Sequence, residues 1–214
     1  MLNILDTVKK TNKKIKVFNA VSGQFYGKSK NNVYNEKSYI DPQSPYGVSK
    51  ASSFWLTKIF REWYGIKCCS GILFNHESPL RSNEFVTKKI INCSKLIKKG
   101  KLKHLYLGNI NIYRDWGWAP EYVEAMYLML RQKNPKDLVI GSGKRHSLRS
   151  FVYEVFRFLK IPRNRLKVNT KKFIRRKDIR SYRSDPRLAK KKLNWKAKTS
   201  FKKIIRKMIC DELF

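Results

Sequence analysis

The apolar positions of the chain form short runs that are separated by longer, helix-like patterns. The first run, residues 15–20, breaks at Ser22 and Gly23, which predicts a buried strand that ends in a loop. A second run, residues 66–75, predicts another strand, and the stretch between the two runs has helical spacing. Strand, helix and strand in this order favour a right-handed parallel crossover, and therefore an α/β sheet.

The predicted helix between these strands carries signals at both of its ends. Ser44 is placed as the N-cap, Pro45 occupies the first helical position, and Gly65 is the C-terminal stop. Apolar residues recur between the caps at helical spacing, namely Val48, Trp55, Ile59 and Trp63.

Strands and helices continue to alternate until about residue 160. The pattern predicts strands within residues 104–109 and 137–143, and helices within residues 85–100, 119–133, 147–161 and 200–214. Ser147 and Ser200 are the expected N-caps of the last two helices. The order loosens after residue 160, where we expect a small basic C-terminal lobe.

Composition places the chain among folded globular proteins. Of its 214 residues, 42% are hydrophobic and 13% aromatic, which is enough for a sizeable core. There is no run of about 18 apolar residues and no signal-peptide pattern, so we expect a cytoplasmic protein without a membrane partner. The four cysteines have no CxxC spacing, and we expect reduced packing residues rather than a metal site or disulfides.

The net charge of +34 raises nucleic-acid binding as a hypothesis. The basic residues are densest from Lys160 to Lys207, where 21 of them face only Asp178 and Asp185. The alternative is that lysine simply fills exposed positions along the whole chain. Because no zinc-finger, helix-turn-helix or aromatic RNA-binding signature occurs there, we expect non-specific attraction to polyanions rather than a dedicated nucleic-acid site.

Tyr46 and Lys50 form the candidate chemical centre, since residues i and i+4 share one helix face. An ammonium beside a phenol favours the phenolate, so Tyr46 could accept and return a proton. Taken alone, a YxxxK pattern is more often just a half-buried tyrosine and a solvated lysine. Ser22 lies at the predicted strand end before this helix, which is where an open α/β sheet binds its ligand.

Several blocks of the chain resemble the GDP-mannose 4,6-dehydratase family of extended short-chain dehydrogenase/reductases. They occur in order over nearly the whole chain: "SGQFYG", "SPYGVSK", "GILFNHESPLRSNEFVTKKI", "YLGNINIYRDWGWAPEYVEAMYLML" and "SDPRLAKKKLNWKAKTSFKKII". The blocks "NHESP" and "RDWGWAPEYVEAM" are more specific than YxxxK, because related epimerases and reductases share the latter.

This resemblance implies a lyase that converts GDP-mannose to GDP-4-dehydro-6-deoxymannose and water with NADP as cofactor. A hydride leaves C4 of the sugar, water is eliminated across C5 and C6, and the hydride returns to C6. By residue matching, Ser22 would hydrogen-bond the reacting oxygen, Tyr46 would accept the proton, and Lys50 would hold the nicotinamide ribose.

Ligand contacts follow from the same resemblance. His76 and Arg81 match cofactor-contacting positions. The substrate-contacting positions are matched by Asn75, Lys88 and Arg175. Outside this motif, Asn75 and His76 would be interpreted as ordinary loop hydrogen-bonding residues.

Two departures from the family pattern bear on activity. Gln24 stands where the family has the glutamate that removes the C5 proton, and an amide has almost no basicity. No GxGxxG or GxxGxxG turn for a pyrophosphate occurs in these residues. We therefore expect a chain that begins within the cofactor domain, is truncated or is one half of a split protein, and would leave strand edges and apolar helix faces uncovered.

The predicted fold is thus an incomplete Rossmann-like parallel sheet lacking its first strands, with a small C-terminal α/β substrate lobe. Residues 1–160 would form the C-terminal part of an NADP domain with interleaved substrate-lobe segments, and 161–214 the basic substrate lobe. The expected partners are GDP-mannose and either further copies of the chain or a separate N-terminal half. A catalytically inactive sugar-nucleotide-binding module and a basic nucleic-acid-binding protein remain as alternatives.

Overall fold

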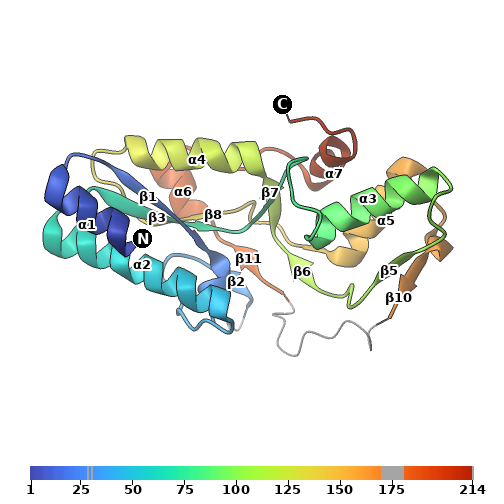
Figure 1. The fold of residues 1–214 in the computed structure, drawn as a ribbon, viewed down its shortest axis with the longest axis horizontal. Helices are drawn as coiled ribbons and strands as arrows, with labels where there is room; N and C mark the ends of the chain where they lie inside the picture. Colours follow the sequence, from blue (N-terminus) through green and yellow to red (C-terminus); the bar gives the residue numbers. More distant parts are fainter. Residues whose placement is uncertain (28, 30, 170–180, 214) are drawn as a thin grey trace. The chain divides into compact units, whose positions relative to one another are not determined.

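The computed structural model describes residues 1–27, 29, 31–169 and 181–213 (Figure 1). The chain divides into two compact units, each built from three stretches. The first unit comprises Met1–Phe74, Glu121–Gly143 and Arg183–Ala197, and the second comprises Asn75–Pro120, Lys144–Tyr182 and Lys198–Phe214. Both units draw on residues before and after 160, whereas the predicted functional domains 1–160 and 161–214 are continuous; that functional division stays a prediction.

The first unit is built on a three-stranded parallel sheet in the order β1-β3-β8. Ser22 at the end of β1 pairs with Leu73 of β3, and Gly71 of β3 pairs with Leu138 of β8. The elements are α1 (Leu2–Thr11), β1 (Val17–Ser22), the 3-10 turn η1 (Gly23–Phe25), β2 (Val33–Tyr34), α2 (Pro45–Tyr64), β3 (Cys68–Leu73), α4 (Ala119–Arg131, mostly in this unit), β8 (Leu138–Ile140), β11 (Arg183–Ser184) and α6 (Arg187–Leu193). The predicted parallel crossover from β1 through α2 to β3 is confirmed, and β2 pairs with β11 apart from this sheet.

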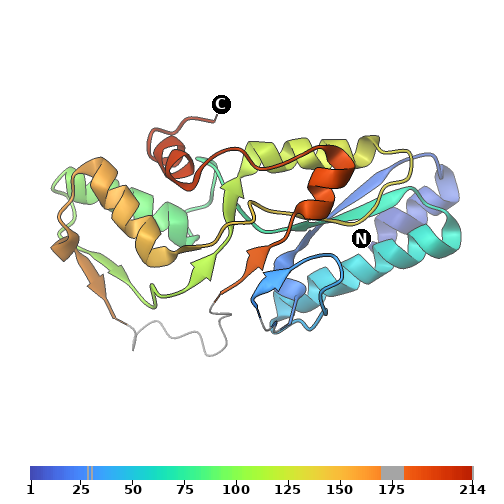
Figure 2. The same cartoon turned by 180° about the vertical axis from the view of Figure 1, so that it is seen from behind.

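Helices cover both faces of this sheet. Cys68 packs with Leu5 of α1 and Phe60 of α2 in one cluster. The next residue along β3, Cys69, packs with Tyr122 of α4 and with α6 in another cluster. Successive side chains of a strand point to opposite faces, so β3 is buried on both sides, as parallel strands usually are. Figure 2 shows α6 in front of these strands when the molecule is seen from behind.

The boundaries of α2 are those that the sequence predicts. The Ser44 hydroxyl accepts a hydrogen bond from the Gly47 backbone N–H at 3.0 Å. Gly65 ends the helix with φ of 68°, in the left-handed region that favours glycine. The four apolar residues that reveal the helical spacing are nevertheless exposed: Val48, Trp55, Ile59 and Trp63. Its buried face is made by Ala51, Phe54, Thr57 and Phe60 instead.

The second unit has a helical core with short strand pairs around it. Its elements are β4 (Asn75–Glu77), α3 (Val86–Lys98), β5 (Leu105–Leu107), β6 (Tyr113–Arg114), β7 (Trp116–Trp118), β9 (His146–Ser147), α5 (Leu148–Leu159), η2 (Arg163–Arg165), β10 (Leu166–Val168) and α7 (Phe201–Ile209). Ile90 of α3, Phe151 of α5 and Ile205 of α7 belong to one buried cluster. The strands pair as β4 with β7, β5 with β10 and β6 with β9. The predicted N-caps Ser147 and Ser200 both accept a backbone N–H.

All four cysteines are free thiols. Cys68 and Cys69 are buried, Cys93 is partly buried, and Cys210 is exposed. Within the described ranges, no cluster of three or more His, Cys, Asp or Glu side chains could hold a metal ion. No helix among the same residues is long and apolar enough to cross a membrane.

Candidate active site

The first unit holds Ser22 and Gln24 at the carboxyl end of β1. The Ser22 hydroxyl accepts a hydrogen bond from the Gln24 backbone N–H at 3.3 Å, which caps η1. The Gln24 side chain is exposed. A Cβ added to Gly47 would lie 2.9 Å from the Gln24 carbonyl oxygen, so only glycine lets the start of α2 approach this loop so closely.

Tyr46 and Lys50 lie on the first turns of α2. The Lys50 ammonium donates a hydrogen bond to the carbonyl oxygen of Ala20 at 2.9 Å, and it lies 5.6 Å from the centroid of the Tyr46 ring. Tyr46 is half exposed, at 50%. Since Ala20 lies two residues before Ser22 on β1, the structure gathers Ser22, Tyr46 and Lys50 at one end of this unit.

These side chains fit one end of a nicotinamide dinucleotide. An anchored ammonium and a phenol can both hydrogen-bond the hydroxyls of a ribose. The pyrophosphate of such a cofactor calls for a GxGxxG or GxxGxxG turn before a helix, and the 214 residues contain neither motif. The side chains gathered here therefore fit the nicotinamide ribose rather than the phosphates.

In the second unit, β4 carries Asn75, His76 and Glu77 side by side with β7. The Asn75 side-chain oxygen accepts a hydrogen bond from the Tyr182 hydroxyl at 2.8 Å. His76 pairs with Gly117 in the register of the two strands. Sequence reasoning missed Tyr182, because the residues between it and the preceding strand carry no regular pattern.

Lys88 lies on the first turn of α3 and is already engaged within the unit. Its ammonium donates a hydrogen bond to the carbonyl oxygen of Pro79 at 2.7 Å and lies 3.7 Å from a carboxylate oxygen of Asp211. Its side chain is 12% exposed. The predicted contact between Lys88 and the substrate stays a prediction, and it would have to compete with these bonds.

Glu77 is a buried carboxyl group between predicted ligand residues. Its side chain is 1% exposed, it accepts a hydrogen bond from the Thr87 hydroxyl at 2.8 Å, and it lies 3.5 Å from Arg81 Nε. Burial raises the pKa of Glu77 to about 7, while the Arg81 charge and the Thr87 hydroxyl oppose this rise. Glu77 belongs to the "NHESP" block, but nothing in the sequence pattern indicates that its carboxyl group is buried.

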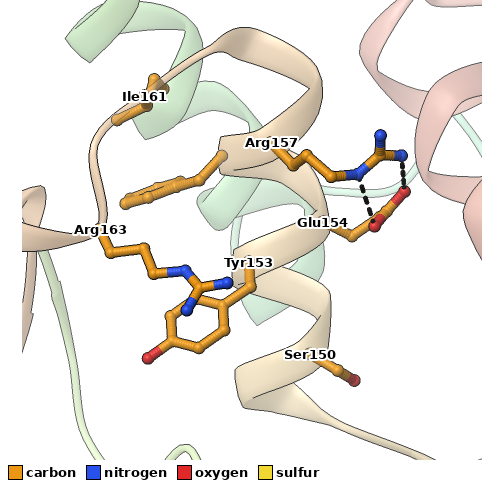
Figure 3. Close-up of a pocket in the computed structure, with 7 residues that line it drawn as sticks. Ser150, Tyr153, Glu154, Arg157, Ile161 and Arg163 are labelled. Carbon is orange, nitrogen blue, oxygen red and sulfur yellow. Dashed lines mark hydrogen bonds and ion pairs between the residues drawn. The ribbon is translucent and has the colours of Figure 1, made fainter.

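Arg175, the remaining predicted substrate contact, lies outside the described residues. The second unit also has a surface pocket of about 400 Å³ on α5 and the turn after it (Figure 3). There the Arg163 guanidinium stacks on the Tyr153 ring at 4.5 Å, and Arg157 pairs with Glu154. None of the predicted site residues lines this pocket, whose lining is Ser150, Tyr153, Glu154, Phe156, Arg157, Ile161 and Arg163.

The parallel sheet with helices on both faces, a serine at a strand end and the Tyr46–Lys50 pair on the next helix are typical of a Rossmann-like fold. Solved structures share this fold. RMD from Pseudomonas aeruginosa complexed with NADPH has a TM-score of 0.89 and 20% identity, covering 99% of this chain and 71% of that one. The dTDP-glucose 4,6-dehydratase from Bacillus anthracis in complex with NAD has a TM-score of 0.87 and 20% identity, covering 98% of this chain and 65% of that one.

The chain belongs to the GDP-mannose 4,6 dehydratase family, whose model matches residues 1–208. The GDP-mannose 4,6 dehydratase of Dictyostelium discoideum is 37% identical over 232 residues, which cover 99% of this chain and 65% of that protein. The resemblance predicted from the sequence blocks is therefore confirmed. The chain spans 53% to 65% of the length of the first curated relatives that it matches.

Proposed function

We propose that this chain carries the acid/base and ligand-binding part of a GDP-mannose 4,6-dehydratase. The observation that carries the proposal is the Lys50 ammonium, which is anchored on Ala20 beside the half-exposed Tyr46 phenol. Membership of the family supports GDP-mannose as the substrate. The NADPH and NAD of the two solved structures support a nicotinamide dinucleotide as the cofactor, NADP in this family.

Each side chain then has a defined task. Tyr46 accepts the proton of the sugar hydroxyl at C4, and Ser22 hydrogen-bonds the same oxygen. Lys50 holds the ribose through its ammonium. The chemistry that NADP supplies is reversible hydride transfer, from C4 and back to C6 of the sugar.

Removal of the C5 proton is the step for which this chain is least equipped. The Gln24 amide occupies the position of the family's base, and loss of a positioned general base typically costs about 10²–10⁴-fold in rate. This favours a second candidate function, a sugar-nucleotide-binding module without dehydration activity. His76, Arg81, Asn75, Lys88 and Arg175 would be the ligand contacts in either case. Assembly with further copies or with a separate N-terminal half stays a prediction.

Turnover by the full chain tests the enzyme proposal. With NADP and GDP-mannose, formation of the 4-keto product is expected to be slow in the wild type and about 10²-fold or more faster in Gln24→Glu. Tyr46→Phe should abolish it, while Tyr39→Phe, whose ring is 79% exposed, serves as the matched control. Absence of turnover in both the wild type and Gln24→Glu would refute the enzyme proposal.

Binding distinguishes the remaining candidates. Calorimetry should give saturable binding of GDP-mannose that Arg175→Ala weakens. Equal affinity for GDP-mannose, heparin and random DNA would instead support attraction by charge alone.

A further inference from the structure

Glu77 connects three segments of the second unit through one buried carboxyl group. It ends β4, its oxygen Oε2 accepts the Thr87 hydroxyl from the first turn of α3, and the same oxygen faces Arg81 in the loop between them. A carboxylate removed from water is costly unless it is hydrogen-bonded and paired with a positive charge. The arrangement therefore depends on the Arg81 guanidinium remaining where it is.

Arg81 is held on two sides. Its Nε lies 3.5 Å from Glu77 Oε2, and its guanidinium carbon lies 3.7 Å from the centroid of the Phe85 ring. Within the described part of the chain, this Nε is buried and makes no hydrogen bond, so Glu77 acts on it through charge. The side chain is 21% exposed, and because Nε is buried, the exposed part includes other atoms of the side chain.

We propose that Glu77 is a positioning residue for Arg81: the ionised carboxylate holds the guanidinium against Phe85, so that its terminal N–H groups can bind a phosphate of the dinucleotide. This rests on the proposed function, which gives Arg81 a cofactor contact. A guanidinium binds phosphate well only in a fixed orientation, because its donors form a rigid fork. When Glu77 takes up a proton, the charge that fixes this orientation is lost.

The groups around Glu77 set the pH at which its carboxylate takes up a proton. Its pKa is raised to about 7, so the carboxyl is protonated at lower pH and ionised at higher pH. On α3, Lys88 beside Thr87 is engaged with Pro79 and Asp211. On β7, Trp118 stands opposite Glu77, and the Lys207 ammonium of α7 lies 5.4 Å from the centroid of its ring. Arg81 is the charge that acts on Glu77 directly.

Calorimetric titration of the full chain with NADP between pH 5.5 and 8.5 tests the proposal. Wild-type affinity should increase at least about fivefold as the pH rises through 7. Glu77→Gln should bind weakly and keep only the pH dependence of the ligand's own phosphate. Thr87→Val should move the midpoint to higher pH, because the hydroxyl bond favours the carboxylate. Glu84→Gln removes an exposed carboxylate from the same loop and should behave as wild type.

A measurement without ligand separates this proposal from the proposed function. The ¹⁵Nε resonance of Arg81 should titrate with a midpoint near 7 in the wild type and stay constant in Glu77→Gln. A wild-type pH profile retained by Glu77→Gln, or an Arg81 resonance that does not follow Glu77, would overturn the positioning role. If the wild type binds no NADP while the resonance still titrates, the proposed cofactor site fails and the coupling between Glu77 and Arg81 stands.

Discussion

The two units position their polar side chains by different means. In the first unit, Ser22 ends a six-residue strand and Tyr46 is the second residue of a twenty-residue helix, so backbone ladders and caps fix both. In the second unit, the corresponding polar residues lie on β4, a strand of three residues, and on the loop after it. Short strands have few backbone hydrogen bonds, so contacts between side chains must also help to fix the positions of these residues.

One carboxylate in each unit illustrates this difference: Asp137 is partly buried and Glu77 is fully buried. Asp137 of the first unit pairs with both terminal nitrogens of Arg61 and accepts the Ser70 backbone N–H at 2.6 Å. Glu77 of the second unit has one hydroxyl donor and a more distant Arg81. Asp137 therefore joins α2 to β3 through its bonds to Arg61 and Ser70. Glu77 has fewer partners, and its raised pKa lets its charge change near pH 7.

The largest expected effect comes from removing the central ring of the second unit. Phe151 is fully buried, with its ring centroid 5.5 Å from that of Trp116. Phe151→Ala should lower the free energy of unfolding by about 3–5 kcal/mol in urea denaturation. Phe158→Ala, on the same helix but 41% exposed, should cost less than about 1 kcal/mol.

Hydrogen exchange of the same variant sharpens the comparison. If the units unfold separately, amides of α5 in Phe151→Ala should lose protection while those of β1 and β3 keep theirs. Equal loss in both units would show that they unfold as one cooperative whole.

The next largest effect is expected from the ion pair of the first unit. Asp137→Asn leaves the partly buried Arg61 guanidinium without its counter-charge, which should cost about 3 kcal/mol. Asp6→Asn removes an exposed partner of Lys10 and should cost about 0.5 kcal/mol or less. Equal effects of the two substitutions in chemical denaturation would contradict the structural role of Asp137.

A smaller effect is expected to be the same in both units. Gly65 after α2 and Gly100 after α3 have φ of 68° and 72°, and a Cβ at either position would meet no neighbouring atom. Each Gly→Ala should therefore cost about 1 kcal/mol through backbone strain alone. Gly65→Asn should cost less than Gly65→Ala, because asparagine tolerates this conformation. Thermal unfolding measures all three, and a larger loss for alanine at one site would reveal a contact beyond the strain.

The smallest effect concerns pH. His146 stacks on Phe201 with ring centroids 3.9 Å apart. Burial and then Lys144 lower its pKa, and Asp115 opposes them. The unfolded chain, whose histidines titrate near 6.5, therefore binds a proton more readily than the folded one, and stability from His146 is lost as the pH falls below this value.

Comparison with His146→Gln isolates the pH-dependent stability that comes from His146. Glu77 contributes in the opposite direction, because its raised pKa makes the folded chain more stable as the pH falls. The free energy of unfolding of the wild type, relative to that of His146→Gln, should decrease as the pH is lowered from 7.5 to 5.5. Urea denaturation measures this difference. A difference that stays constant over this range would show that the stacked ring is not responsible.

Local sequence signals predict the helices of both units better than their short strands. Ser44, Pro45 and Gly65 mark α2 correctly because caps and stops depend on neighbouring backbone. The exposed side of α2 was not predictable, since Trp55 and Trp63 have the spacing of a buried face while Phe54 and Phe60 make the contacts. Strands of two or three residues, such as β4 and β7, leave no periodicity to detect.

The same holds for the candidate site: residues placed by local signals were predictable, and those placed by tertiary contacts were not. The positions of Ser22, Tyr46 and Lys50 could be predicted from a strand end and a helix start. The contact between Asn75 and Tyr182, 107 residues apart, depends on tertiary pairing that a single sequence does not reveal. Glu77 was missed for the same reason.

The alkylation of Cys68 and Cys69 can report local opening of the sheet in the first unit. Burial raises their pKa to about 11 and about 12, and alkylation requires the thiolate. The two neighbouring thiols belong to opposite helical layers, so iodoacetamide reaches Cys68 when the α1 and α2 side opens and Cys69 when the α4 and α6 side opens. The relative alkylation rates of Cys68 and Cys69 can thus show which face of the sheet opens first.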